Sequence, residues 1–212
     1  MLERRWCTAV AFLALLCGNA GVARAEGIDF GVGIGRADAG KRSAGTLLIQ
    51  GDGGVETPSD ITMGSGFTIV PRMTLNAGDY ISHDLSFAYS RANVQVNLAG
   101  ANLFDQSTSI GQAMYNMLLH ATKDGSRFRP YVAGGGGLVM FYPPGAGLTS
   151  GVNTVRPGVN YGAGLRVQVN ERWHARVDFR QTLAPNPRLF QGQDASGLFR
   201  QNQFTIGAGI SF

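Results

Sequence analysis

Hydrophobic and polar residues alternate along most of the chain from about residue 27 onward. The last segment, QFTIGAGISF, has small and polar residues on one face, and its other face carries Phe204, Ile206, Ala208, Ile210 and Phe212. This period of two predicts a β-strand, because successive side chains of a strand point to opposite faces. We expect eight such strands, at about residues 27–36, 64–75, 84–97, 109–121, 129–142, 158–170, 173–181 and 203–212.

The two faces of these segments differ in an unusual way. In segment 173–181 one face is continuously apolar, and the other carries His174, Arg176, Asp178 and Arg180. A soluble protein buries its apolar face and places many charges outside, but here the apolar face is the continuous one in segments of about ten residues. The pattern predicts an all-β fold, an eight-stranded antiparallel up-and-down transmembrane β-barrel, because only closure removes strand edges that hydrocarbon cannot satisfy.

Two segments are irregular. In segment 84–97 the apolar parity shifts after Tyr89, which predicts a β-bulge near Arg91. In segment 129–142 four consecutive glycines remove the contrast between the faces, so the pattern does not show which residues point outward.

The predicted connections alternate in length. Long polar stretches cover about residues 37–62, 98–108, 143–155 and 182–200, and shorter links cover 76–83, 122–127 and 170–172. Bacterial barrels have long extracellular loops and short periplasmic turns. If the first long stretch forms a hairpin that joins the wall, the barrel has ten strands instead of eight.

The N-terminus predicts export. Two arginines at positions 4 and 5 precede a short apolar run and the motif Ala23-Arg24-Ala25, the order found in a secretory signal peptide. We expect cleavage after Ala25, which leaves residues 26–212 as one barrel domain. Lipoprotein processing at Cys17 is a rival prediction. Both cysteines, Cys7 and Cys17, lie in the segment to be removed, so the exported chain has no disulfide.

The low content of charged residues limits the kinds of binding partner that we expect. Charged residues make up only 15% of the chain, against about a quarter in an average soluble protein. Half of the formal net charge of +4 comes from the expected signal peptide, and the small remainder does not point to a nucleic-acid partner.

Three stretches carry a resemblance to a known family: RPYVAGGGG at 129–137, NYGAGLRVQVNERWHARVDFRQ at 160–181, and the terminal QFTIGAGISF. From about Gly27 to Phe212 the chain resembles the small outer-membrane β-barrel proteins of the eight-stranded OmpA/OmpX type. The resemblance implies a location in the bacterial outer membrane, contact with outer-membrane lipid and lipopolysaccharide, and assembly by the barrel-assembly machinery. It also implies a C-terminal assembly signal, which would comprise Phe212, Ile210 and Phe204.

Several aromatic residues lie beside or within the predicted short turns. Phe212 falls in the lipid-facing register of the last strand, at its periplasmic end. We expect Trp173, Tyr80 and Phe128 to join it in a periplasmic aromatic girdle.

Candidate chemistry is sparse. His83 is expected in the first periplasmic turn, His120 near the periplasmic end of the fourth strand and His174 just after the third turn. An enzyme acting on outer-leaflet lipid would need its base at the opposite rim, and the sequence suggests no serine with a clear basic partner. We therefore expect no enzyme, no metal site and no cofactor.

The charged residues on the inward faces are more informative about function than the three histidines. Asp178 lies between Arg176 and Arg180 in the seventh strand, while Arg166 and Asp29 face inward from the sixth and first. The lumen of an eight-stranded barrel is just wide enough to be filled by side chains, so these charges should pair as a structural plug. The alternative is a narrow, weakly anion-selective pore. Inward glycines fit either case, because they leave room for folded arginines or for water.

The sequence favours a structural or surface-interaction role through the long loops, with a possible binding partner outside the cell. A small solute pore is the alternative, and a lipid-modifying enzyme comes third.

Overall fold

The computed structural model describes residues 27–39, 46–50, 56–98, 101–142, 154–185 and 198–212. The expected signal peptide and its cleavage site lie outside these residues. The described residues form ten strands: β1 (Gly27–Asp38), β2 (Thr46–Gln50), β3 (Glu56–Met63), β4 (Ser65–Asn76), β5 (Ile81–Leu98), β6 (Ala101–His120), β7 (Phe128–Tyr142), β8 (Thr154–Gln168), β9 (Trp173–Pro185) and β10 (Leu198–Ser211). Within the described part of the chain, no helix has the length and apolar character needed to cross a membrane.

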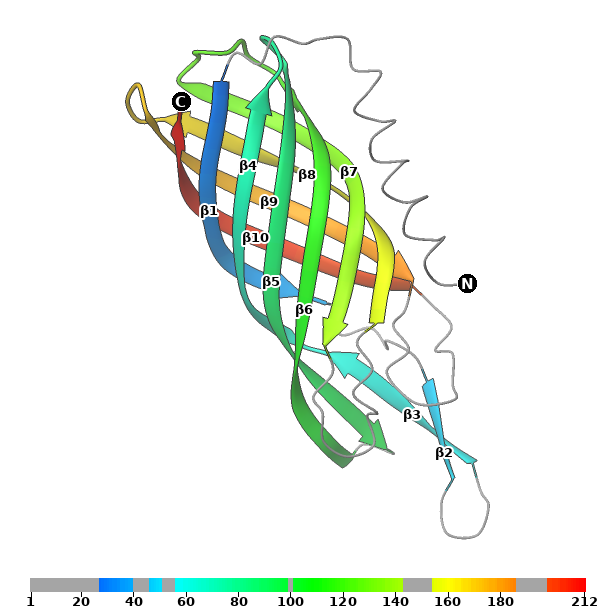
Figure 1. The fold of residues 1–212 in the computed structure, drawn as a ribbon. Coiled ribbons are helices and arrows are strands. Elements are labelled where there is room, and N and C mark those ends of the chain that lie inside the picture. The colour runs from blue at the N-terminus through cyan, green and yellow to red at the C-terminus, as the bar shows by residue number, and fades with distance from the viewer. Residues whose placement is uncertain (1–26, 40–45, 51–55, 99–100, 143–153, 186–197) are drawn as a thin grey trace.

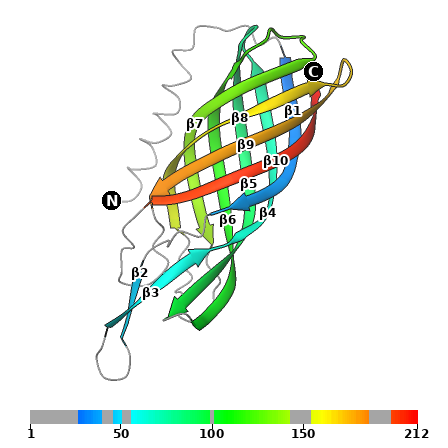
Figure 2. The same ribbon diagram turned by 180° about the vertical axis from the view of Figure 1, so that it is seen from behind.

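Eight of these strands form a closed antiparallel barrel (Figures 1 and 2). The ring runs β1–β4–β5–β6–β7–β8–β9–β10, and the pairing of β10 with β1 completes it. The predicted barrel is therefore confirmed. β2 and β3 form a hairpin that attaches to β5 only at Asp60↔Asn97 through Met63↔Val94, so the hairpin extends the sheet and the wall keeps eight strands.

The irregularity near Arg91 differs from the prediction. The β5–β6 register is unbroken past Arg91 and shifts only between Val96 and Asn97. On the other side of β5, the pairs Met63↔Val94 and Thr68↔Ser90 place four residues, 64–67, opposite three, 91–93. The extra residue thus belongs to residues 64–67, where β3 passes into β4 and which include Gly64 and Gly66, and not to β5.

Two connections also differ from their predicted bounds. The expected loop at 98–108 is mostly strand, because β5 and β6 continue as a paired ribbon to Leu98↔Ala101. The first long connection holds the β2–β3 hairpin. The predicted strand 84–97 already covers most of β5, whereas residues 101–108 of β6, ANLFDQST, fall in the predicted loop because hydrophobic and polar residues do not alternate there.

The short turns follow from local chemistry. Gly78 and Gly125 adopt positive φ values of 110° and 78°, which glycine reaches without a steric penalty. In the β8–β9 turn, the side-chain Oδ1 of Asn170 accepts hydrogen bonds from the backbone N–H groups of Arg172 and Trp173, at 3.0 and 2.8 Å. This Asx-type arrangement reverses the chain within a few residues.

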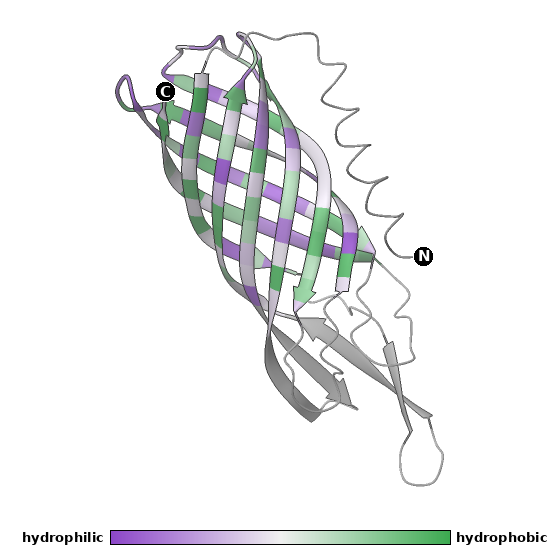
Figure 3. Cartoon of the chain, in the orientation of Figure 1, coloured by the Kyte–Doolittle hydropathy of each residue, from purple (hydrophilic) through white to green (hydrophobic). Residues whose placement is uncertain are grey.

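Burial is inverted relative to a soluble protein. The large side chains Phe30, Val159 and Phe179 are exposed on the outside of the wall, whereas Asp29, Arg176 and Gln201 are buried inside. Figure 3 shows the resulting alternation of hydrophobic and hydrophilic residues along the strands. An apolar exterior around a polar interior is the arrangement that a lipid bilayer requires.

Candidate functional site in the barrel lumen

Asp178 of β9 is the centre of a charge cluster in the lumen. Its carboxylate accepts hydrogen bonds from Arg72 Nη1 at 3.0 Å, from Arg176 Nε at 2.9 Å and from Arg180 Nη2 at 3.2 Å. Asp178 is only 2% exposed, so each of these bonds forms away from bulk water. A buried carboxylate needs such partners, because an unpaired buried charge is costly.

The cluster reaches across the barrel to β5. Arg176 Nη1 lies 3.3 Å from Asp84 Oδ1, and Thr74 donates a hydrogen bond of 2.8 Å to the same oxygen. β5 and β9 are four strands apart in either direction around the ring, so this ion pair joins opposite walls. The cluster contains Arg72, Arg176, Arg180, Asp84 and Asp178, with a formal charge of +1.

Tyr131 of β7 completes the cluster. Its hydroxyl donates to Asp178 and accepts a 2.6 Å hydrogen bond from Arg176 Nε, while the Arg176 guanidinium lies 4.7 Å from the ring centroid. Gly164 is paired with Tyr131 on β8, and a Cβ there would overlap the Tyr131 ring. The glycine therefore makes room for the aromatic side chain to fold across its neighbour.

One inward glycine also makes room for an arginine. A Cβ on Gly162 would lie 2.9 Å from Arg180 Cδ and would overlap the carbonyl oxygen of Phe179, whereas one on Gly31 would meet Arg72 Cγ at an ordinary contact distance of 3.6 Å. Of the two uses of inward glycines that the sequence left open, the geometry at Gly162 corresponds to the folding of an arginine side chain across the lumen.

A second polar group lies nearer the periplasmic end. Arg166 of β8 forms an ion pair with Asp29 of β1 and donates to Ser211 at 3.0 Å. Asn76 donates a 3.2 Å hydrogen bond to Asp29. The five residues expected in one lumen cluster thus separate into two groups, because Asp29 pairs with Arg166 and not with the Asp178 group.

Sequence reasoning missed three members of the central cluster: Arg72, Asp84 and Tyr131. In the second predicted strand, Arg72 lies on the face away from the outward Ile69 and Met73, so the alternation of faces could have identified Arg72 as inward. Parity could have found Asp84 in the same way. Tyr131 was hidden by the glycine run, and the structure now shows that the even positions of β7, such as Val132, point outward.

Two further layers cross the lumen on the extracellular side of the cluster. Gln112 donates to Gln201, which lies on the opposite wall of the ring, and Thr182 donates to Gln112 at 3.0 Å. Beyond these amides, Phe141 and Phe199 pack edge to face with centroids 4.9 Å apart, and both are buried. A polar lumen is therefore followed by an apolar layer.

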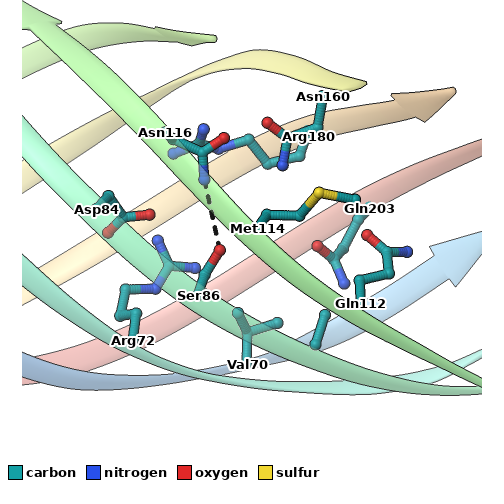
Figure 4. Close-up of a pocket in the computed structure, with 11 residues that line it drawn as sticks. Val70, Arg72, Asp84, Ser86, Gln112, Met114, Asn116, Asn160, Arg180 and Gln203 are labelled. Carbon is teal, nitrogen blue, oxygen red and sulfur yellow. Dashed lines mark hydrogen bonds between the residues drawn. The ribbon is translucent and has the colours of Figure 1, made fainter. Parts of the chain in front are cut away.

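A small cavity lies between the charge cluster and the glutamine layer (Figure 4). Its volume of about 10 Å³ is room for roughly one water molecule. Among its lining atoms, Asp84 Oδ2, Asn116 Oδ1, Asn160 Oδ1 and Arg180 Nη1 are buried without a hydrogen-bond partner in the described part of the chain. One donor and several acceptors around a water-sized space suit a bridging water, which accepts one hydrogen bond and donates two.

The histidines all lie at the periplasmic end, but their surroundings differ from the prediction. His83 is not in a turn: it is the third residue of β5, and its Nδ1 lies 2.7 Å from the Tyr115 hydroxyl on the outer surface. His120 Nε2 lies 3.0 Å from Ser82 Oγ, so one serine does have a basic neighbour. His174 Nδ1 lies 3.4 Å from Ser211 Oγ. The described residues contain no group of three or more potential metal ligands.

The predicted girdle residues lie on the exterior near the short turns. Trp173, Tyr80 and Phe128 are all exposed, and Phe212 is 75% exposed. Phe212 exchanges backbone hydrogen bonds of 2.9 and 3.2 Å with Ile28, and its ring meets Phe30 at a centroid distance of 6.2 Å. Phe204 is exposed on the same face of β10, where Ile210 is half-buried.

A closed eight-stranded barrel with an apolar exterior and a charged, hydrogen-bonded lumen defines an integral membrane protein of the bacterial outer-membrane class. The chain belongs to the outer membrane protein beta-barrel domain family, whose model matches residues 8–212. It is therefore a protein of the bacterial outer membrane, as the sequence predicted. No curated protein matches the sequence.

Solved structures show the same fold at low sequence identity. The outer membrane protein OprG from Pseudomonas aeruginosa is 15% identical, with a TM-score of 0.59 and coverage of 91% of this chain and 99% of that one. Neisserial surface protein A is 11% identical, with a TM-score of 0.53 and coverage of 87% and 97%. The N-terminal barrel domain of P. aeruginosa OprF is 12% identical, with a TM-score of 0.50 and coverage of 88% and 100%.

Proposed function

We propose that this protein is a structural or surface-interaction protein, a closed barrel that holds its extracellular connections at the cell surface. The observation that carries the proposal is the ion-pair cluster around Asp178, which joins opposite walls through Arg176 and Asp84. Side chains that bond across a lumen of this width leave little space for a solute.

Three other layers support a closed lumen. The pair of Arg166 and Asp29 lies on the periplasmic side of the cluster, and the bonded Gln112 and Gln201 lie on the extracellular side. The buried pair of Phe141 and Phe199 forms a fourth, apolar layer, which is unfavourable for ions because it offers no polar groups to replace their hydration. The sheet of β3, β5 and β6 continues beyond the barrel (Figure 1), which supports a role at the extracellular surface.

A narrow, weakly anion-selective pore is the second candidate. The excess of arginine over aspartate in the central cluster favours it, because a positive lumen attracts anions. The Ser82 and His120 pair gives less support to an enzyme. Ser82 is 0% exposed and donates to Asn76 Oδ1 at 2.8 Å, so its hydroxyl lies away from any lipid substrate.

Planar-bilayer recording of the refolded barrel tests the proposal against the pore. We expect the wild-type protein to show no steady openings. The variants Arg176→Ala and Asp178→Ala should also be silent, since the glutamine and phenylalanine layers remain, but they should unfold at lower denaturant concentration.

A fourth protein, Phe141→Ala combined with Phe199→Ala, is the control for the apolar layer. It should stay silent because the charge cluster is intact below it. Steady wild-type openings with anion selectivity that changes in Arg176→Ala would overturn the closed-barrel proposal and establish the pore.

A further inference from the structure

The outer surface of the wall changes character at the extracellular end of β1, β4 and β5. Along β1 the outward residues Val32 and Ile34 are followed by the exposed Arg36, and along β5 Phe87 and Tyr89 are followed by the exposed Arg91. The apolar band of an outer-membrane barrel is about 25 Å tall, or roughly ten residues of a tilted strand. Counted from the periplasmic end of β1 and β5, both arginines lie at the upper edge of that band.

The sheet register brings the two arginines to either side of one aromatic residue. Arg36 is paired with Phe67 across β1 and β4, and Phe67 and Arg91 each lie one residue beyond the pair Thr68↔Ser90 on its extracellular side. Phe67 is 59% exposed on the same outer surface. Neighbouring strands are about 4.8 Å apart, so the backbones of the two arginines, on β1 and β5, are about 10 Å apart. Both arginine side chains are long enough to contact one anionic group that lies between them.

The orientation of Arg36 fits this arrangement. Its Nη2 donates a hydrogen bond to Ser65 Oγ on β4, so the guanidinium leans from β1 toward β4 and hence toward Phe67. Among the described residues on this outer face of β1, β4 and β5, the charges at the extracellular end are Arg36, Asp38 and Arg91. Asp38 lies two residues farther along β1, on the side away from the apolar band, and the local excess of charge is positive.

The geometry points to a binding site for the phosphate of an anionic glycolipid of the outer leaflet. Arg36 and Arg91 hold the phosphate, because a guanidinium matches phosphate oxygens with paired hydrogen bonds. The acyl chains of the same lipid pack on Phe67 and on the apolar band directly below it. The site lies on the outside of the wall, so it is independent of whether the lumen conducts.

Lipid A with two phosphates and the same lipid with its phosphates removed are the probes. Binding of each to the refolded barrel in micelles is measured by native mass spectrometry for the wild type and for Arg36→Gln combined with Arg91→Gln. The matched control is Arg127→Gln combined with Arg172→Gln, which removes the same charge from exposed arginines at the periplasmic turns. Heat-dependent gel mobility verifies that each protein is folded.

We expect the wild type and the periplasmic control to prefer the phosphorylated lipid by about tenfold, a difference of roughly 1.4 kcal/mol. The Arg36 and Arg91 variant should lose this preference, and Arg36→Lys with Arg91→Lys should recover part of it. Equal preference in the wild type and in the Arg36 and Arg91 glutamine variant would overturn the proposal, as would an equal loss in the periplasmic control.

Discussion

At the residue scale, Asp178 is the acceptor that the arginines of the central cluster share. Three arginines from two strands, Arg72, Arg176 and Arg180, donate to its two oxygens, and Tyr131 donates as well. The three guanidinium groups share this one carboxylate, so the compensation of their positive charge depends on it.

Asp178→Asn tests this dependence. The amide keeps the size of the side chain but removes the negative charge, so the three buried arginines repel one another without their shared partner. We expect a loss of about 3–5 kcal/mol in the free energy of unfolding, measured by urea titration of the barrel in lipid vesicles.

Asp79→Asn is the control for charge removal. Asp79 pairs with Lys123 at 3.9 Å, and both side chains are more than half exposed. The change should cost at most about 1 kcal/mol. A similar small effect of Asp178→Asn would contradict the central role of that carboxylate.

At the element scale, the glycine run of β7 lets β6 and β7 approach closely on the inside of the barrel. A Cβ on Gly135 would overlap the backbone carbonyl oxygen of Tyr115 on β6, and one on Gly137 would overlap that of Ala113. The outward Gly134 has open space, with no atom within 4 Å of its Cβ position among the described residues. The inward glycines of this strand are therefore structural.

Alanine substitution distinguishes the two faces of β7. Gly135→Ala should destabilise the barrel by about 1–3 kcal/mol, because β6 and β7 must move apart to accept the methyl group. Gly134→Ala should be close to neutral, since its methyl group points into lipid. Urea unfolding of both variants in the same vesicles gives the comparison, and equal effects would show that close approach is not what requires glycine at position 135.

At the scale of the whole molecule, closure of the ring depends on the pairing of β1 with β10. Phe212 takes part through its backbone bonds to Ile28 and through the contact of its ring with Phe30. The backbone bonds do not depend on the aromatic side chain. Folding and recognition by the assembly machinery can thus be separated by substitution.

Phe212→Ala should fold in vitro nearly as well as the wild type but should reach the outer membrane of cells in several-fold lower amount. Phe30→Ala loses the same ring contact and keeps the terminal aromatic residue, so it should assemble normally. Outer-membrane fractions compared by immunoblot, with refolding in vesicles alongside, provide the measurement. Equal assembly of the two variants would mean that Phe212 is not the assembly signal.

Most of the wall was predictable from the sequence, because alternation is a local property of each strand. Residues such as Ile34, Phe87 and Phe179 point outward as their parity predicts. Where hydrophobic and polar residues do not alternate, neither face could be assigned. The four glycines of β7 left its outward face undetermined, so the inward position of Tyr131 was not predicted. The β2–β3 hairpin and residues 101–108 of β6 lack the membrane-type pattern and fall in the predicted connections, although a hairpin in the first long stretch was left open.

For every wall strand except β7, the sequence by itself determined which face meets lipid, and hence the barrel class and its membrane, because these follow from a period of two along one strand. Only the tertiary structure decided which inward charges meet. Arg176 bonds to Asp84 because ring closure places β9 opposite β5, and Asp29 bonds to Arg166 because the register brings them to one level. Such pairings join residues about 90 or more positions apart, a separation that no local pattern encodes.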